Sequence, residues 1–347
     1  MRGLDARRSE AALRRVACAV IGLVFPDRWV WDFWLVRDGA DHHVFYLQAP
    51  SDIASPDGRH WHASIGHAVS SDLTNWQVLG DALRPGPPGS WDDASTWTGS
   101  VVPVDGGWAM LYTGISTAER GLVQRIELAR STDLLHWDKH GGPVLEADAR
   151  WYELYDTADP AGSAAAVPRP WPDQAWRHPW VYPDGNGRWQ AVLTARAGTG
   201  DPAERGVVGQ ARSADLLHWE VLPPLTPPRS GFGQMEVPQL LERGGRTYLI
   251  FCSDTETQAP DRRRTGAGTG TYYLVSDSAA GPFEVVGSGV LEADHRGSAY
   301  AGKLHETTQG GLVFLAWHRT RRDGAFHGAL GDPRPVSVNP DGSLRLG

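Results

Sequence analysis

A short phrase that returns at regular spacing constrains the fold of this chain more than any other feature. The phrase joins serine and aspartate to a following leucine and tryptophan, and each copy comes after a short apolar run. Self-similarity at a regular period is typical of a repeat architecture. Three copies are clear and a fourth is looser, at intervals of roughly 60 to 80 residues: Ser71-Asp72-Leu73 with Trp76, Ser131-Thr132-Asp133-Leu134 with Trp137, Ser213-Ala214-Asp215-Leu216 with Trp219, and Ser276-Asp277 before Phe283.

A second series of strand-like segments runs in step with the first. Its members are short, aromatic and β-branched, and most follow a turn signal. Five hairpins predict five sheets, and four-stranded sheets repeated around a channel form a β-propeller. A sandwich would not explain the tandem phrase, and a β-helix has a shorter period, so we predict an all-β, five-bladed β-propeller. The five segments are His43–Leu47, Trp108–Tyr112, Trp189–Leu193, Thr247–Phe251 and Leu312–Trp317.

Length and composition agree with a single propeller domain. With 347 residues, 41% of them hydrophobic, the chain can bury a large core, and the repeats span nearly all of it. We therefore predict a propeller over residues 25–347, without a C-terminal β-sandwich, after an extension or short helix over residues 1–24. This extension places arginines before an apolar run but lacks a convincing cleavage site. We expect a cytoplasmic protein, with secretion as the alternative.

Charge narrows the classes of partner. A net charge of -8 gives no basic footprint for nucleic acid or for an anionic membrane, so a neutral or polar small molecule fits better. Several histidines, including His42, His43, His60, His62 and His67, lack the spacing of a metal site, and we expect neither a metal nor another cofactor.

Two lone carboxylates point to chemistry on the propeller axis. The innermost strand of each blade lines the channel, and Asp32 and Glu236 stand alone in apolar or aromatic segments at the starts of two repeats. Burying such a group is costly unless it is hydrogen-bonded or used. Two facing carboxylates can hydrolyse or transfer a glycoside. Alternatively, Asp32 caps a turn and Glu236 pairs with an arginine such as Arg177.

At these residues the chain resembles the five-bladed propeller glycosidases of glycoside hydrolase families 32 and 68, the β-fructofuranosidase, levanase and levansucrase group. The resemblance covers roughly Trp29 to the C-terminus, and the absence of a sandwich is closer to family 68. The segments that carry it are Trp31-Asp32-Phe33-Trp34 (nucleophile), Trp97-Thr98-Gly99-Ser100 (second-blade substrate contact), Arg177-His178-Pro179 (an Arg-Asp-Pro motif) and Glu236 (general acid/base).

The resemblance implies a retaining hydrolase or transglycosylase that acts on fructofuranosides such as sucrose or a fructan. Asp32 would be the nucleophile that forms a fructosyl-enzyme, and Glu236 would be the acid that then becomes the base. The implied contacts to the sugar are Trp31, Trp97, Ser100, Arg177, His178 and Tyr300.

His178 departs from the family pattern, which has an aspartate that accepts hydrogen bonds from two ring hydroxyls. A neutral imidazole offers one acceptor and an imidazolium offers none. The change is compatible with a weak enzyme, a different sugar or acceptor, or a propeller that binds sugar without cleaving it. A further alternative is that His178 only packs, while Asp92, Asp93, Asp156 or Asp159 serves instead.

Two other functional classes stay open at this point. One is an inverting furanosidase of the family 43 type, an arabinofuranosidase or xylosidase, which needs a wider gap between its carboxyl groups. The other is a non-catalytic carbohydrate-binding propeller, for which His178 is the motive.

Overall fold

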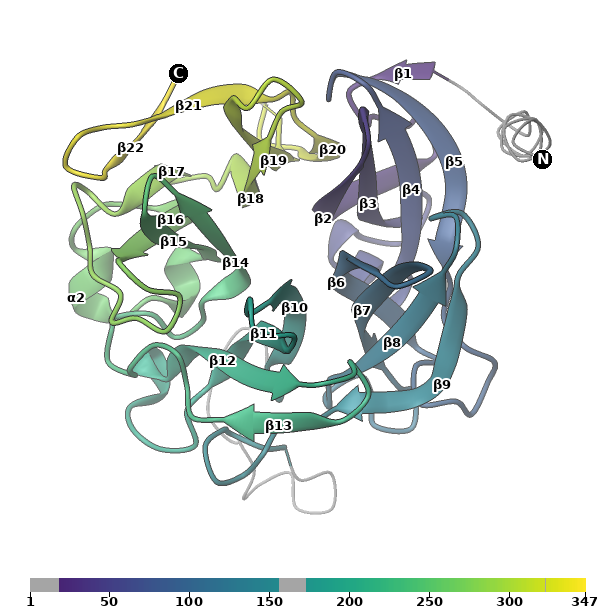
Figure 1. The fold of residues 1–347 in the computed structure, drawn as a ribbon, viewed down its shortest axis with the longest axis horizontal. Helices are drawn as coiled ribbons and strands as arrows, with labels where there is room; N and C mark the ends of the chain where they lie inside the picture. Colours follow the sequence, from purple (N-terminus) through teal and green to yellow (C-terminus); the bar gives the residue numbers. More distant parts are fainter. Residues whose placement is uncertain (1–18, 156–172, 322) are drawn as a thin grey trace.

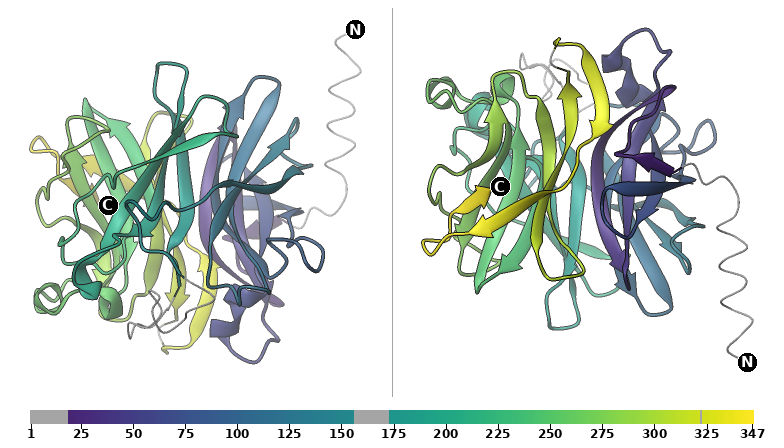
Figure 2. Two further views of the ribbon diagram at one scale, coloured as in Figure 1. Left: turned by 90° about the horizontal axis from the view of Figure 1, so that it is seen from below. Right: turned by 90° about the horizontal axis from the view of Figure 1, so that it is seen from above.

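Five antiparallel sheets surround a central axis in the computed structural model, which describes residues 19–155, 173–321 and 323–347 (Figure 1). The sheets follow one another in chain order around the ring, and both side views show their strands running along the axis (Figure 2). The predicted all-β, five-bladed propeller is confirmed. Within the described residues every named strand belongs to one of the five sheets.

In each sheet the earliest full-length strand is innermost and the following strands lie progressively outward. The first two sheets comprise β2 (Arg28–Asp38), β3 (Asp41–Pro50), β4 (Ser64–Ser70), β5 (Asn75–Leu83) and β1 (Ala19–Ile21), then β6 (Ser95–Val104), β7 (Gly107–Ile115), β8 (Arg125–Ser131) and β9 (Asp138–Leu145). The third and fourth comprise β10 (Trp176–Pro183), β11 (Trp189–Arg196), β12 (Gly206–Ser213) and β13 (Trp219–Leu222), then β14 (Glu236–Arg243), β15 (Arg246–Ser253), β16 (Thr269–Ser276) and β17 (Val290–Asp294).

The fifth sheet is assembled differently, since its second strand pairs with two later ones. Short helices lie in the connections between strands. The strands are β18 (Ala299–Glu306), β19 (Leu312–Thr320), β20 (Phe326–Leu330), β21 (Arg334–Val338) and β22 (Leu344–Leu346), and the helices are η1 (Pro56–Trp61), η3 (Pro202–Glu204), η4 (Thr255–Thr257) and α2 (Pro260–Arg263). The five predicted strand segments lie on β3, β7, β11, β15 and β19, as expected.

The repeated phrase forms the same turn between the third and fourth strands of three sheets. In the third sheet, the Ser213 hydroxyl accepts hydrogen bonds from the amides of Asp215 and Leu216, at 3.1 and 2.9 Å. The Asp215 carboxylate accepts from the next two amides, and Trp219 Nε1 donates to the Leu216 carbonyl at 2.9 Å. The phrase is therefore a self-satisfied turn, since its own side chains pair the backbone groups that the ladder leaves open.

In the first sheet the serine that makes this turn is Ser70 and not Ser71. Ser70 is buried and its hydroxyl accepts from the amides of Asp72 and Leu73, at 3.1 and 2.9 Å, whereas Ser71 is exposed. The sequence reading was one residue out of register because both positions are serine. The leucines of all three turns adopt positive φ, near 64°, and are buried: Leu73, Leu134 and Leu216.

The ring closes through backbone contacts between the first and last sheets. Strand β1 joins the first sheet by pairing with β5, and Leu23, two residues after β1, forms a bridge with Leu330 of β20 in the fifth sheet, where the Leu330 amide donates to the Leu23 carbonyl at 3.3 Å. Residues 19–23 thus take part in the propeller, although the sequence placed them in the extension. Residues 1–18 lie outside the described part, so the boundary of the extension stays a prediction. Within the residues described, no helix has the length and apolar character needed to cross a bilayer.

All five innermost strands carry a β-bulge near the point where they reach the channel. The ladder to the second strand shifts next to Trp31, Trp97, Arg177, Glu236 and Tyr300. A bulge turns side chains away from the regular alternation. In four of the sheets a non-glycine residue adopts positive φ at the bulge: Asp32, His178, Val237 and Ala301. The bulges aim side chains from five sheets at one axis.

The hydrogen bonds that Ser70 accepts in this turn should contribute measurably to the stability of the protein. We expect Ser70→Ala to lower the free energy of unfolding by about 1–2 kcal/mol, because the buried Leu73 amide and the partly buried Asp72 amide lose their acceptor. Ser71→Ala, a change of the same atoms at the next, exposed position, should shift stability by less than about 0.5 kcal/mol. Chemical denaturation of both variants measures the difference, and equal effects would contradict the assigned turn.

Candidate active site

A cavity of about 560 Å³ lies among the bulges of the inner strands. All five sheets contribute to its walls, together with the helices η1 and η4. Its lining combines aromatic faces with ionisable groups, a composition suited to a polar ring that stacks and forms hydrogen bonds. The lining includes Trp31, Asp32, Arg59, His60, Trp97, Arg177, His178, Gln234, Glu236, Asp254, Tyr300, Trp317 and Arg319.

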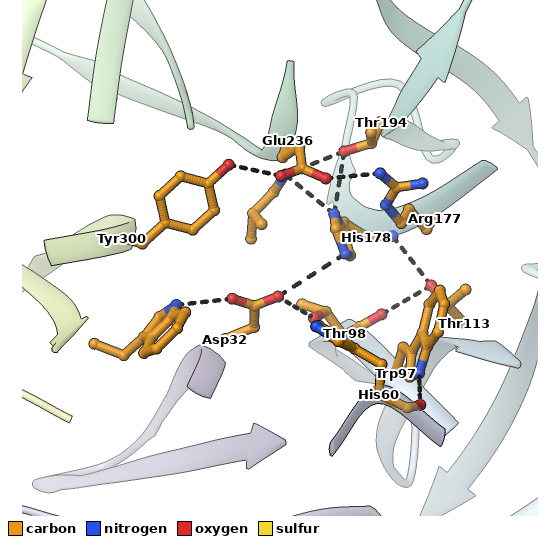
Figure 3. Close-up of polar contacts among 12 residues, drawn as sticks. Asp32, His60, Trp97, Thr98, Thr113, Arg177, His178, Thr194, Glu236 and Tyr300 are labelled. Carbon is orange, nitrogen blue, oxygen red and sulfur yellow. Dashed lines mark hydrogen bonds and ion pairs between the residues drawn. The ribbon is translucent and has the colours of Figure 1, made fainter. Parts of the chain in front are cut away.

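Asp32 is held at the bulge of β2 with its carboxylate aimed at the cavity (Figure 3). Trp317 Nε1 donates a hydrogen bond to Oδ1 at 2.9 Å, and the Thr98 hydroxyl lies 3.5 Å from Oδ2. Burial, and next the charge of Glu236, raise the pKa of Asp32 to about 6. Its backbone adopts a φ of 24°, which strains a residue other than glycine.

Arg59 is the positive group that most opposes this rise in the pKa of Asp32. Its guanidinium lies over the rings of Trp31, Trp317 and Phe326, at 5.4, 5.8 and 4.8 Å from their centroids. Burial lowers the pKa of Arg59 to about 10, which leaves it charged at neutral pH. The aromatic cage thus holds a cation beside the candidate nucleophile.

Glu236 begins β14 and binds two neighbours in the cavity. Arg177 Nη2 lies 2.6 Å from Oε1, and the Tyr300 hydroxyl donates to Oε2 at 2.6 Å (Figure 3). The alternative that Glu236 pairs with Arg177 is therefore correct as a contact. Because the pair lines the cavity, the contact orients the carboxylate toward the space that Asp32 also faces.

His178 lies at the bulge of β10, between the two carboxylates. Its Nε2 is 4.0 Å from Asp32 Oδ2, and its Nδ1 is 3.2 Å from the backbone nitrogen of Val237, the residue after Glu236. Burial, followed by the charges of Arg177 and Lys303, holds the pKa of His178 well below its usual value. The imidazole is therefore neutral at physiological pH.

The remaining sequence predictions divide into two groups. Trp31, Trp97 and Tyr300 line the cavity as expected. Ser100 does not, because its hydroxyl accepts a hydrogen bond from the Val181 amide at 3.0 Å and so joins the second sheet to the third. It is Thr98, two residues earlier and next to the bulge, that reaches toward Asp32.

Two of the four carboxylates considered as substitutes for His178, Asp92 and Asp93, do not line the cavity. Asp92 binds Tyr112 and Lys139 away from the cavity, and Asp93 accepts from the amides of Gly89 and Thr117. The other two candidates, at positions 156 and 159, lie outside the described residues.

The histidines at positions 42, 43, 60 and 67 are not gathered in one place. His42 pairs with His305 at 2.8 Å, and His43 pairs with His67 at 2.9 Å. His60 lies in the cavity wall. Within the described residues no three side chains of metal-ligating type form a cluster.

Sequence reasoning missed several groups that shape the cavity. Trp317 was read only as part of a strand, and Arg59 lies in the short helix η1, for which the repeat gave no signal. Asp254 and Arg319 pair at 2.6 Å on the cavity wall. No local pattern marks these residues, because the ring brings them to the axis from the second strands and from connecting segments.

The fold and the cavity define a five-bladed propeller of the glycosidase type. The model for the glycosyl hydrolases family 32 N-terminal domain matches residues 34–343 of the chain. This chain belongs to glycosyl hydrolase family 32. The predicted class, a glycosidase of the group that acts on fructofuranosides, is thereby confirmed.

Individual relatives agree with this assignment. The extracellular sucrase of Zymomonas mobilis is 27% identical, over 93% of this chain and 84% of the sucrase. The raffinose invertase of Escherichia coli is 25% identical over 94% of this chain, which spans 63% of the invertase. The inulosucrase from Halalkalicoccus jeotgali bound to kestose shares the fold, with a TM-score of 0.74, 22% identity, and coverage of 97% of this chain and 94% of that one.

The pKa of Asp32 predicts opposite pH dependences for activity and stability. As the candidate nucleophile, Asp32 would have to be ionised, so kcat/KM should fall as pH drops below about 6. The folded pKa lies above the ordinary value of 3.8, so the native state binds this proton more tightly than the unfolded chain. The contribution of Asp32 to stability should therefore rise as pH falls through 6.

Asp32→Asn separates the two effects. At pH 8 the variant should be inactive and more stable than the wild type by roughly 2 to 3 kcal/mol, since it removes a buried charge. The gain should shrink toward pH 4. Asp105→Asn, at an exposed turn, should change neither quantity. Denaturant titrations across this range measure the effect, and an Asp32→Asn variant less stable than wild type at pH 8 would count against the raised pKa.

Proposed function

We propose that this protein is a retaining enzyme that hydrolyses or transfers the fructosyl unit of a neutral fructofuranoside such as sucrose or a fructan. The observation that carries the proposal is the presence of Asp32 and Glu236 in one cavity, in different environments. Two carboxyls with distinct surroundings can divide the roles of nucleophile and acid. Family membership and the names of the relatives support fructose as the transferred sugar.

In this mechanism Asp32 attacks the anomeric carbon while Glu236 donates a proton to the departing oxygen. The bond from the anomeric carbon to that oxygen breaks as the bond to the Asp32 carboxylate forms. Glu236 then takes a proton from water, or from an acceptor hydroxyl, which attacks the fructosyl-enzyme and frees Asp32. The Trp317 indole and the Arg59 cation favour the ionised form of Asp32.

The remaining residues would bind the sugar. Trp31 and Trp97 present aromatic faces, and Arg177, Tyr300 and His178 present polar groups in the cavity. Ser100 supports the second sheet instead. We place no metal in the mechanism, since the two carboxyl groups supply its acid and its nucleophile.

The charge of the cavity supports a neutral substrate over a sugar phosphate. Three arginines are outnumbered by carboxylates, and Arg177 and Arg319 are each already paired with one. A phosphate would therefore meet net negative charge. The carboxylates of the lining are Asp32, Asp57, Glu236, Asp254 and Glu256.

The compartment stays a prediction. We infer a cytoplasmic enzyme with secretion as the alternative, for which the extracellular sucrase among the relatives is the motive.

Trapping the intermediate tests the mechanism. Glu236→Gln should lower sucrose turnover by about 10² to 10⁴, because the departing oxygen loses its acid. A fructosyl fluoride needs no such acid, so on this variant the intact-protein mass should rise by one fructosyl unit, mapped to the peptide that contains Asp32. Glu284→Gln, an exposed position, is the matched control.

Each competing function gives a different result in the same experiment. An inverting furanosidase would turn over without any adduct. A carbohydrate-binding propeller would bind sugar saturably, with no turnover above buffer by the wild type or by Asp32→Asn.

A further inference from the structure

The backbone and the side chain of His178 are held by hydrogen-bond contacts from three strands. The residue lies at the bulge of β10 with a φ of 58°, and its side chain is 7% exposed. Its own amide donates to the Thr113 hydroxyl on β7, at 3.0 Å. Its ring contacts Thr194 on β11 and Val237 on β14 (Figure 3).

The contacts at Nδ1 favour one of the two neutral forms of the ring. The Val237 amide, which can only donate, lies 3.2 Å from Nδ1 and 3.1 Å from the Thr194 hydroxyl oxygen. A lone pair on Nδ1 can accept from this amide, whereas a hydrogen on Nδ1 could meet only the Thr194 oxygen. The arrangement in which both contacts of Nδ1 are hydrogen bonds has Nδ1 as acceptor, with Thr194 Oγ1, 3.2 Å away, accepting from the amide and donating to the ring.

The other nitrogen, Nε2, therefore carries the proton, and it faces the cavity. It lies 4.0 Å from Asp32 Oδ2, which is too long for a direct hydrogen bond. An oxygen about 2.8 Å from both atoms fits this gap and would accept from Nε2 and donate to the carboxylate. Such an oxygen is what a ring hydroxyl of a bound sugar supplies.

We propose that His178 is a specificity-determining residue that donates a hydrogen bond from Nε2 to a ring substituent of the sugar. The imidazole at position 178 then requires an acceptor atom on the sugar. A carboxylate at the same position would instead require a hydroxyl that donates a proton. The proposal rests on the proposed function for the identity of the sugar, and its geometry rests on the contacts of His178 alone. The expected substrate is a furanoside that offers an acceptor atom at this position, whether or not that atom bears a hydrogen.

The tautomer is measurable without any activity. Long-range ¹H–¹⁵N correlation spectra of the ¹⁵N-histidine protein should show one ring, absent from His178→Asn, as the neutral form protonated at Nε2 between pH 5 and 8. A ring protonated at Nδ1, or one that titrates near pH 6.5, would overturn the proposal regardless of turnover.

The direction of the proposed hydrogen bond is tested by a double-mutant-type cycle, in which residue 178 of the enzyme and a ring hydroxyl of the substrate are changed separately and together. Ring hydroxyls of a fructofuranoside are replaced one at a time by fluorine, which keeps a weak acceptor and removes the donor. At one position the wild type should lose less than about tenfold in kcat/KM, and His178→Asp should lose about tenfold more than the wild type. His178→Asn, which keeps an amide donor, should follow the wild type.

Each outcome of the cycle bears on a different claim. If no position couples to residue 178, or if the wild type depends more on the hydroxyl than His178→Asp does, the proposal is wrong while the enzyme assignment stands. Thermal unfolding of both variants confirms that they are folded. If the wild type turns over no fructofuranoside, the proposed function fails, and the assignment of the sugar contact fails with it.

Discussion

The cavity depends on the buried guanidinium of Arg177. A charge in this position is tolerated only when it is paired and fully hydrogen-bonded. Nη1 contacts Asp173 at 2.6 Å and Gln124 at 3.1 Å, and Nη2 contacts Gln234 and Glu236, each at 2.6 Å. Gln124 directly precedes β8 of the second sheet, Asp173 precedes β10 of the third, and Gln234 and Glu236 lie at the start of the fourth. One side chain therefore joins three blades and also fixes the orientation of the candidate acid, so the integrity of the ring and the geometry of the site share a cause.

The bulges of the inner strands also serve both the ring and the site. A propeller needs its inner strands to converge without collision, and a bulge bends the strand and turns a side chain out of the ladder. In the second sheet the residue at the bulge is Gly99, where an added Cβ would collide with the Leu111 carbonyl. In the first and third sheets the positions at positive φ are Asp32 and His178. The surrounding fold stabilises these strained backbone conformations, which occur where polar groups must face the axis.

Sequence periodicity predicted the blades because each hairpin carries its own turn chemistry, as Ser213 and Asp215 illustrate. Asp32 and Glu236 were found because a carboxylate in an apolar segment is a local anomaly. Trp317, by contrast, donates to Asp32 across 285 positions of sequence, and no local rule links the two. Ser100 was expected in the site because the resemblance covers the whole segment Trp97-Thr98-Gly99-Ser100, in which a strand of regular alternation would place Thr98 and Ser100 on one face. The bulge between Trp97 and Gly99 breaks that alternation and turns Ser100 toward Val181.

The polarity of residue 178 also bears on how the cavity tolerates its charges. Glu236 already raises the pKa of Asp32, and a third carboxylate at position 178 would raise it further in the absence of sugar. A neutral imidazole with its proton on Nε2 removes that repulsion and presents a donor to Asp32 Oδ2 across 4.0 Å. The Val237 amide that fixes this tautomer directly follows Glu236. The conformation of the β14 bulge therefore bears on both the Glu236 carboxylate and the imidazole that faces Asp32.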